Sequence, residues 1–284
     1  MDYEALKAWQ FTDVRQSFTK RDTMLYALGL GLGADPMDRD QLRFVYERDL
    51  MALPTMAVVL GGPGMWVRDP RLKADWKRVL HGEQGLTLFR SLPVEGTVIG
   101  RTRLTGVVDR GAEKGAFVFT ERDVIDAASG ERVALLQSTS VLRGDGGFGG
   151  PSGPTPQPHA LPKRAPDFAV DLPTLPQAAL IYRLSGDMNP LHADPEIGAA
   201  AGFPRPILHG LCTFGVAGHA LLKSCCSYRP ERFKSMRARF SSPVYPGETV
   251  RTEIWRDGST ISFRAQVVER NVIVLNNGRA EVTA

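Results

Sequence analysis

Residues 208–222 read LHGLCTFGVAGHALL, and this run decides which folds the chain can adopt. It predicts a helix over Ile207–Cys226 that is apolar on nearly every face, so the helix has to be buried on most sides. It is too rich in glycine for a convincing membrane span, which needs roughly 20 predominantly apolar residues. Small residues that let other backbone approach closely recur along it, namely Gly210, Gly215, Ala217 and Gly218.

Strand-like segments follow this helix and recur in the first half of the chain. Val250, Thr252 and Ile254 alternate with polar neighbours, as half-buried antiparallel strands do. The expected strands cover residues 96–109, 116–126, 132–143, 248–257, 260–269 and 272–282. Each half of the chain thus has helical segments followed by meandering strands. This arrangement predicts an α+β fold in which a curved sheet wraps a helix.

The two halves repeat each other faintly. LYALGLG (25–31) matches IYRLSGD (181–187), and LPTMAVVLGG (53–62) matches LCTFGVAGHA (211–220). Phe89 with Gly96 likewise matches Phe240 with Gly247, in the same order along the chain. Three matches in one order at similar offsets indicate duplication of one unit.

A glycine- and proline-rich stretch separates the halves. Residues 143–167 contain 12 Gly or Pro in 25 positions and cannot supply a periodic apolar face. We therefore expect an N-terminal half (1–142), a linker (143–167) and a C-terminal half (168–284). Within the first half, GGPG (61–64) interrupts the counterpart of the long apolar helix. The shortened helix would leave room beneath the first sheet, lined by Met51, Leu53, Met56 and Val59.

Composition excludes several classes of function. The chain has 284 residues, a net charge of +4 and a pI near 9.0, with no block of like charges. Nucleic acid is therefore not an expected partner, whereas scattered basic residues suit an anionic small molecule. The three cysteines cannot form a disulfide framework, and we expect buried thiols in a reducing compartment. No charged and then apolar leader opens the sequence.

The stretch YRLSGDMNPLHADPEIGAAAGF (182–203) contains the candidate chemistry. Asn189-Pro190 is a typical helix start, and we expect a helix over 191–201 that Gly202 ends. Asp187 in the preceding loop and His192 in the first turn could then converge as an acid–base pair that handles water. An equally supported alternative is that Asp187 only caps backbone amides and His192 is solvated.

The start of the long helix is a second candidate site. Pro204 and Pro206 make its lead-in extended, so the N–H groups near Gly210 are free. Such a turn can polarise a carbonyl oxygen, although the amides could equally meet water. No zinc-type spacing and no activated cysteine is evident, so neither a metal nor a covalent nucleophile is expected.

These motifs resemble a known family. YRLSGDMNPLH, ILHGLCTFG, YALGLG, LPTMAVVLGG, VLHGEQ, GGFGG and PVYPGETV together resemble the (R)-specific enoyl-CoA hydratases, the hydratase 2 branch of the MaoC-like dehydratases. The likeness covers nearly the whole chain and extends to the hydratase part of peroxisomal multifunctional enzyme type 2. It implies a double hot-dog fold, with each half wrapping a curved antiparallel sheet around a central helix.

The resemblance also implies roles for individual residues. Asp187 and His192 match the catalytic pair, and Gly210 matches the amide that polarises the thioester. Residues that match substrate-binding positions are His81, Gly82, Lys114, Met188, Asn189, Pro190, Leu191, Gly210 and Phe240. Without the family, a surface loop for His81, a solvated turn for Lys114 and a core position for Phe240 are the simpler interpretations. No motif assigns a role to His209 or His219, and we expect both to be buried and hydrogen-bonded.

The implied activity is the reversible hydration of trans-2-enoyl-CoA to (R)-3-hydroxyacyl-CoA without a cofactor or a metal. The alternative is a hot-dog acyl-CoA thioesterase, which could use the same carboxylate and amide. A non-catalytic acyl-CoA binding module would need no acid–base pair. We further expect a homodimer without a membrane span. The C-terminal AEVTA lacks the usual peroxisomal tripeptide, so a cytoplasmic location is expected and a peroxisomal one is left open.

Overall fold

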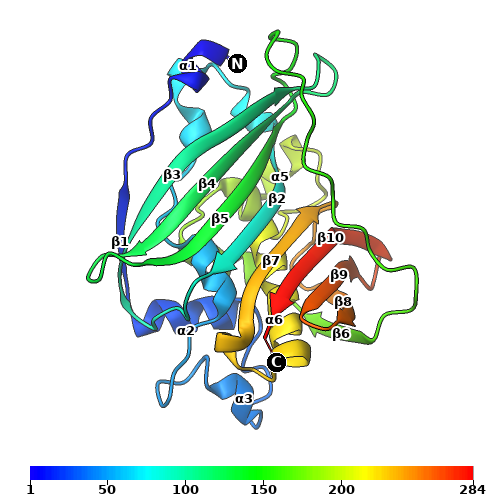
Figure 1. Cartoon of the computed structure of the whole chain (residues 1–284). Helices are drawn as coiled ribbons and strands as arrows, with labels where there is room; N and C mark the ends of the chain where they lie inside the picture. Colours follow the sequence, from blue (N-terminus) through cyan, green and yellow to red (C-terminus); the bar gives the residue numbers. More distant parts are fainter. Residues whose placement is uncertain (284) are drawn as a thin grey trace.

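One antiparallel sheet of ten strands runs through the molecule, with the order β1-β3-β4-β5-β2-β7-β10-β9-β8-β6 (Figure 1). The computed structural model describes residues 1–283. The strands are β1 (Val14–Phe18), β2 (Val79–Leu88), β3 (Gly96–Asp109), β4 (Ala116–Asp126), β5 (Arg132–Leu142), β6 (Phe168–Pro173), β7 (Phe233–Phe240), β8 (Thr249–Asp257), β9 (Thr260–Val267) and β10 (Val272–Val282).

The helices are short apart from one. The α-helices are α1 (Tyr3–Lys7), α2 (Lys20–Gly29), α3 (Arg39–Leu42), α4 (Ala178–Tyr182), α5 (Pro195–Ala200) and α6 (Gly210–Cys226). The 3-10 turns are η1 (Pro54–Val59), η2 (Trp66–Arg68), η3 (Pro70–Leu72), η4 (Trp76–Arg78), η5 (Arg183–Ser185), η6 (Pro190–His192) and η7 (Pro230–Arg232). The predicted α+β plan, a sheet with a central apolar helix, is thus confirmed.

The order of the strands has the symmetry that the sequence repeat predicts. From the outer edge to the centre of the sheet, the first half has the order β1, β3, β4, β5 and β2. From the other edge to the centre, the second half has the equivalent order β6, β8, β9, β10 and β7. The equivalent strands β2 and β7 pair with each other at the centre of the sheet, where Gly85 lies opposite Arg237 (Figure 1). The two half-sheets therefore join through β2 and β7 into one continuous sheet.

The matched segments of the two halves also lie together. Tyr26 of α2 packs against its counterpart Tyr182 of α4, with ring centroids 5.8 Å apart. The counterpart of α6 is η1, which ends at Val59 and is followed by Gly61 at a φ of +63°. A Cβ on Gly61 would lie 2.7 Å from the Gly100 Cα, so the segment after η1 approaches β3 as closely as glycine allows. The long helix of the second half is thus replaced in the first half by a short 3-10 turn.

Helix α6 begins three residues later than the sequence predicts. Leu208 lies before the helix, and its N–H donates to the Val244 carbonyl oxygen, 2.7 Å away. His209 is the N-cap, with a ψ of 133°. The small residues inside α6 are explained by contacts: a Cβ on Gly215 would lie 2.7 Å from Leu30, and one on Gly218 would lie 2.4 Å from Thr55.

The helix expected over 191–201 is wrong as a continuous element. The chain forms the 3-10 turn η6, leaves the helical region at Ala193, and starts α5 with Asp194 as a new N-cap. Pro195 explains the break, because a proline has no N–H to donate and its ring clashes with the carbonyl four residues earlier. Gly202, at a φ of +86°, follows α5 and ends it as expected.

The segment 143–167 contains neither helix nor strand. It packs along the second half-sheet, where His159 Nε2 lies 2.8 Å from Ser262 Oγ and the His159 carbonyl accepts from Asn277 Nδ2 at 2.8 Å. No helix within residues 1–283 combines the length and the apolar character that a membrane crossing requires.

Candidate active site

Asp187 lies in the loop between η5 and η6. Gly186 precedes it with a φ of +119°, a turn that a side chain at that position would strain. The Asp187 Oδ1 atom accepts from the Asn189 N–H at 3.1 Å, and Asn189 Oδ1 accepts in turn from the Leu191 N–H at 3.2 Å. Asn189 therefore caps η6 as predicted. The second carboxylate oxygen of Asp187 has no protein donor among the described residues.

His192 lies at the end of η6, and its side chain is buried. Its Nδ1 is 2.9 Å from the Ile207 carbonyl oxygen. Because a carbonyl can only accept, the proton of the neutral ring is on Nδ1 and the lone pair is on Nε2. The lead-in to α6 thus fixes both the orientation and the tautomer of His192.

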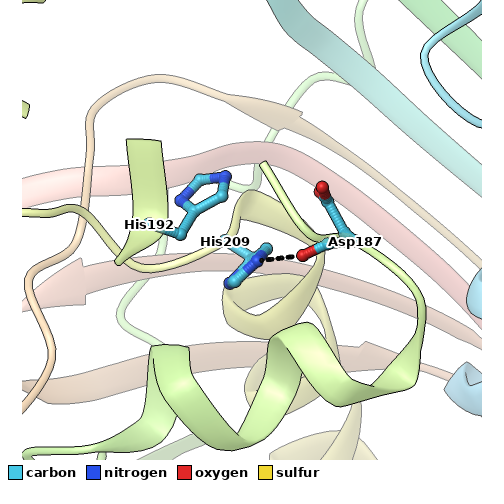
Figure 2. A group of neighbouring side chains, drawn as sticks. All are labelled: Asp187, His192 and His209. Carbon is cyan, nitrogen blue, oxygen red and sulfur yellow. Dashed lines mark hydrogen bonds between the residues drawn. The ribbon is translucent and has the colours of Figure 1, made fainter. Parts of the chain in front are cut away.

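His209, the N-cap of α6, completes a cluster with these two residues (Figure 2). Its Nε2 donates to the main-chain oxygen of Asp187 at 3.1 Å, which is the dashed contact in Figure 2. Its ring stacks on His192 with centroids 3.7 Å apart and planes inclined by 29°. The expectation that His209 is buried and hydrogen-bonded is confirmed, but sequence reasoning missed its place beside the pair. The available signal was the adjacency of His209 to Gly210 at the first turn of the helix.

Burial keeps both rings of this cluster neutral near pH 7. Desolvation lowers the pKa of His192 below its usual value, and the nearby Asp187 carboxylate opposes this shift only in part. Desolvation, and next the repulsion that a protonated His192 would exert, lower the pKa of His209 to about 4. The Nε2 atom of His192 is therefore available as a proton acceptor at neutral pH.

The cluster could also hold a metal ion. One ligand atom from each of Asp187, His192 and His209 lies within 4.8 Å of the others. His192 bonds the Ile207 carbonyl through Nδ1, which leaves its Nε2 free as a ligand atom, whereas His209 Nε2 already donates to the Asp187 carbonyl. Three ligands of this kind suit zinc, but an acid–base pair with a supporting histidine has the same composition.

The first turn of α6 offers unused amide donors next to the cluster. The N–H groups of Cys212 and Thr213 donate to the His209 carbonyl, whereas those of Gly210 and Leu211 have no acceptor among the described residues. A Cβ on Gly210 would lie 3.2 Å from Phe240, so the glycine lets this ring close over the helix terminus. Such a terminus can stabilise negative charge on an oxygen atom.

Comparisons with known proteins identify the family of this chain. Residues 16–144 match the family model of the MFE-2 hydratase 2 N-terminal domain, and residues 158–278 match the MaoC like domain. The peroxisomal enoyl-CoA hydratase 2 of Arabidopsis thaliana is 39% identical, over 96% of this chain and 93% of that protein. This chain belongs to the hydratase 2 branch of the MaoC-like family.

Solved structures support the fold of this hydratase 2 chain. A MaoC-like dehydratase from Phytophthora capsici aligns with a TM-score of 0.86 and 36% identity, covering 100% of this chain and 99% of the other. A Mycobacterium tuberculosis protein with a double hot-dog fold aligns with a TM-score of 0.58 over 96% of each chain at 14% identity, and so supports the fold alone. The predicted double hot-dog fold is confirmed.

His81 of this hydratase 2 chain does not lie in a surface loop. It is part of strand β2, so the interpretation of His81 as a surface-loop residue is wrong. The pairing of β2 with both β5 and β7 holds the segment extended at the centre of the sheet. The His81 ring packs on Phe240 with centroids 4.7 Å apart, and its Nε2 lies 3.0 Å from Ser138 Oγ. Burial lowers the pKa of His81 to about 4, against an opposing effect of Asp187.

The remaining substrate-binding candidates divide into packed and exposed positions. Gly82 forms the bulge of β2, and a Cβ there would lie 2.8 Å from Val141, so packing alone requires glycine. Met188 and Pro190 are exposed beside Asp187, and Leu191 is half-buried. Lys114 is exposed in the turn between β3 and β4, where its N–H donates to the Gly111 carbonyl. The structure does not group Lys114 with the cluster.

Proposed function

We propose that Asp187 and His192 add water to the double bond of a trans-2-enoyl-CoA to give the (R)-3-hydroxyacyl-CoA, with the Gly210 amide polarising the thioester. The activity, that of a hydro-lyase, follows from membership of the hydratase 2 branch. One observation supports the residue roles most directly. The lone pair of His192 Nε2 and the Asp187 carboxylate belong to one cluster at the open amides of α6.

The reaction needs three events at defined atoms. A water molecule held between Asp187 and His192 Nε2 gives up a proton to this pair as its oxygen attacks C3. The electron pair of the double bond moves toward the thioester oxygen, where the Gly210 N–H stabilises the enolate. The pair then returns the proton to C2, so that one water supplies both added groups and nothing else is consumed.

His209 acts as a positioning residue in this proposal. Its bond to the Asp187 main chain and its stack on His192 fix the two catalytic groups relative to each other. Removal of a positioning residue lowers kcat because small misplacements of reacting groups are costly. Its neutral ring adds no competing positive charge beside His192 Nε2.

The test is incubation of the purified protein with a trans-2-enoyl-CoA. We expect loss of the conjugated ultraviolet absorbance and a single 3-hydroxyacyl-CoA enantiomer, the (R) form. A thiol reagent in parallel detects free coenzyme A, which a hot-dog thioesterase would release. Thiol release at the rate of absorbance loss, or an (S) product, would contradict the proposal.

We also propose that each chain has one active site, formed by residues 168–284, while residues 1–142 bind acyl and coenzyme A groups. In the internal alignment Gly31 stands opposite Asp187 and Pro36 opposite His192, so the first half lacks both groups. Titration with a tight, unreactive acyl-CoA analogue should give one equivalent per chain. Two productive sites per chain, or turnover by the first half alone, would refute this division.

The homodimer, the cytoplasmic location and a coenzyme A contact at Lys114 stay predictions. Light scattering of the purified protein measures its mass in solution, and twice the mass of one chain is the expected result. For Lys114, the variant Lys114→Ala should raise KM for the acyl-CoA and leave kcat unchanged.

A further inference from the structure

Arg122 is a partly buried cation that the proposed reaction does not use. It lies on β4 between Thr102 of β3 and Leu136 of β5, both of which are buried on the inner face of the first half-sheet. Its Nη2 donates to the Val58 carbonyl of η1 at 2.7 Å. Its Nε is shielded from solvent and has no acceptor, and within residues 1–283 it forms no ion pair.

Arginines on the outer face of the same strands differ from Arg122 because they form ion pairs. Arg103 of β3 pairs with Glu121 and with Asp123, and Arg132 of β5 also bonds Asp123. Arg103 and Arg132 thus have carboxylate partners, whereas the inward Arg122 donates only to a main-chain carbonyl. Burial lowers the pKa of Arg122 to about 10, which reflects how poorly its charge is solvated. A buried charge without a counter-charge is costly and indicates a missing partner.

A second unpaired donor lies next to Arg122. Thr102 is the direct cross-strand neighbour of Arg122, and its Oγ1 is buried without a hydrogen-bond partner. Side chains opposite each other in antiparallel strands have Cβ atoms about 5 Å apart. Gly62 leaves the guanidinium its space, because a Cβ there would lie 2.8 Å from Arg122 Nη1. A guanidinium beside a hydroxyl is a suitable pair of donors for a carboxylate.

A row of side chains that contact or lie opposite one another connects this position with the catalytic cluster. Phe240, which touches Gly210, packs on His81, and His81 bonds Ser138 of β5. Ser138 lies opposite Thr120 of β4, two residues from Arg122 on the same face. The charges of Asp187 and of Arg122 both act on the pKa of His81, Asp187 raising it and Arg122 lowering it. An acyl chain whose reacting end lies at Asp187 and whose other end extends beneath the first half-sheet would therefore approach Arg122.

We propose that Arg122, together with Thr102, binds a carboxylate that the acyl group carries remote from its thioester. The enzyme would then prefer 2-enoyl-CoA substrates whose chain ends in an anion over those that end in a methyl group. This inference rests on the proposed hydratase function and adds a specificity determinant in the first half. In this proposal the chain terminus takes the place that a helix as long as α6 would fill, because its counterpart η1 is only a short 3-10 turn.

The test uses two series of trans-2-enoyl-CoA substrates, matched in length from six to sixteen carbons, that end in a methyl group or in a carboxylate. At the preferred length we expect kcat/KM to be about 10-fold to 100-fold higher for the carboxylate, in line with a charge-assisted hydrogen bond. Arg122→Met should abolish this preference and raise kcat/KM for the methyl-ended substrate. Thr102→Val, which keeps the shape of the side chain, should reduce the preference by a smaller factor.

Arg103→Met is the matched control, because it removes an arginine from the outer face of the neighbouring strand and should leave the preference unchanged. The inference is overturned if the wild type favours the methyl-ended substrate at every length, or if Arg122→Met lowers both series equally. Should Arg122→Met fail to fold, an unchanged preference in Thr102→Val overturns it. Hydration of methyl-ended substrates alone would leave the proposed function intact, whereas no hydration in either series would remove both.

Discussion

Replacing His192 by asparagine separates its catalytic atom from its structural one. The asparagine Nδ2 occupies nearly the place of the histidine Nδ1 and can still donate to the Ile207 carbonyl, which His192 bonds at 2.9 Å. The variant has no group at the position of Nε2, the proposed proton acceptor. We therefore expect His192→Asn to fold like the wild type and to lose most of its turnover.

The expected size of the loss follows from the role of the atom. General acid–base catalysis contributes about 10²–10⁴-fold, so kcat should fall by a factor of this order. His192→Ala should lose a similar factor and should in addition destabilise the fold. It leaves the Ile207 carbonyl without its donor and takes away the ring on which His209 stacks. A buried polar group without a partner costs about 1–3 kcal/mol of unfolding free energy, a loss that the asparagine variant should largely avoid.

The assay combines turnover with urea unfolding of both variants and the wild type. Hydration is followed by the loss of the conjugated absorbance at saturating 2-enoyl-CoA. If His192→Asn kept kcat within tenfold of the wild type, Nε2 would not be the proton acceptor. If both variants had the same urea midpoint, the bond to Ile207 would not be what stabilises this turn.

Three further predictions concern the same site. Gly210→Ala places a Cβ 3.2 Å from Phe240, so we expect about a tenfold lower kcat that Phe240→Leu partly restores; wild-type turnover of the single variant would contradict this. Burial lowers the pKa of His209 and of His219 to about 4 in the folded protein, against about 6.5 when unfolded. The unfolding free energy should therefore be constant above pH 6.5 and fall between pH 6.5 and 4, by up to about 3 kcal/mol per histidine. Urea midpoints at pH 7 and 5 measure this, and His219→Phe should weaken the dependence, whereas a pH-independent wild-type midpoint would contradict it. Removal of metals with a chelator should leave turnover unchanged; a loss that zinc restores would show that the cluster of Asp187, His192 and His209 works as a metal site.

The sequence predicted the regular elements where periodicity and composition are strong. The bounds of β3, β4 and β10 are those expected from alternation over 96–109, 116–126 and 272–282. Strands β2 and β7 at the centre of the sheet were not predicted, because polar residues such as His81 and Arg239 interrupt their apolar pattern. These residues are accommodated by partners, for example the Ser138 hydroxyl for His81 and the Glu83 carboxylate for Arg239. Local patterns carry no information on such distant partners.

The same limit applies to the site. The motif around Asp187 and His192 contains its own caps, so the turn that presents the two side chains could be predicted locally. The break at Pro195 follows from local rules as well, and the expected helix over 191–201 neglected it. The contribution of His209 could not be predicted, since it depends on packing the start of α6 against a loop 22 residues earlier in the chain.

The sequence by itself determined the duplicated α+β plan, the buried apolar helix and the six residues from Asp187 to His192 that contain the chemistry. These features depend on short-range periodicity, on glycine and proline, and on groups adjacent in the chain. The tertiary structure alone decided that β2 and β7 fuse the halves, that Ile207 sets the tautomer of His192, and that His81 and Arg122 share an inner face. The physical reason is that hydrogen bonds and desolvation act between atoms close in space, and these atoms can belong to residues far apart in the chain, such as Glu83 and Arg239, which are 156 positions apart.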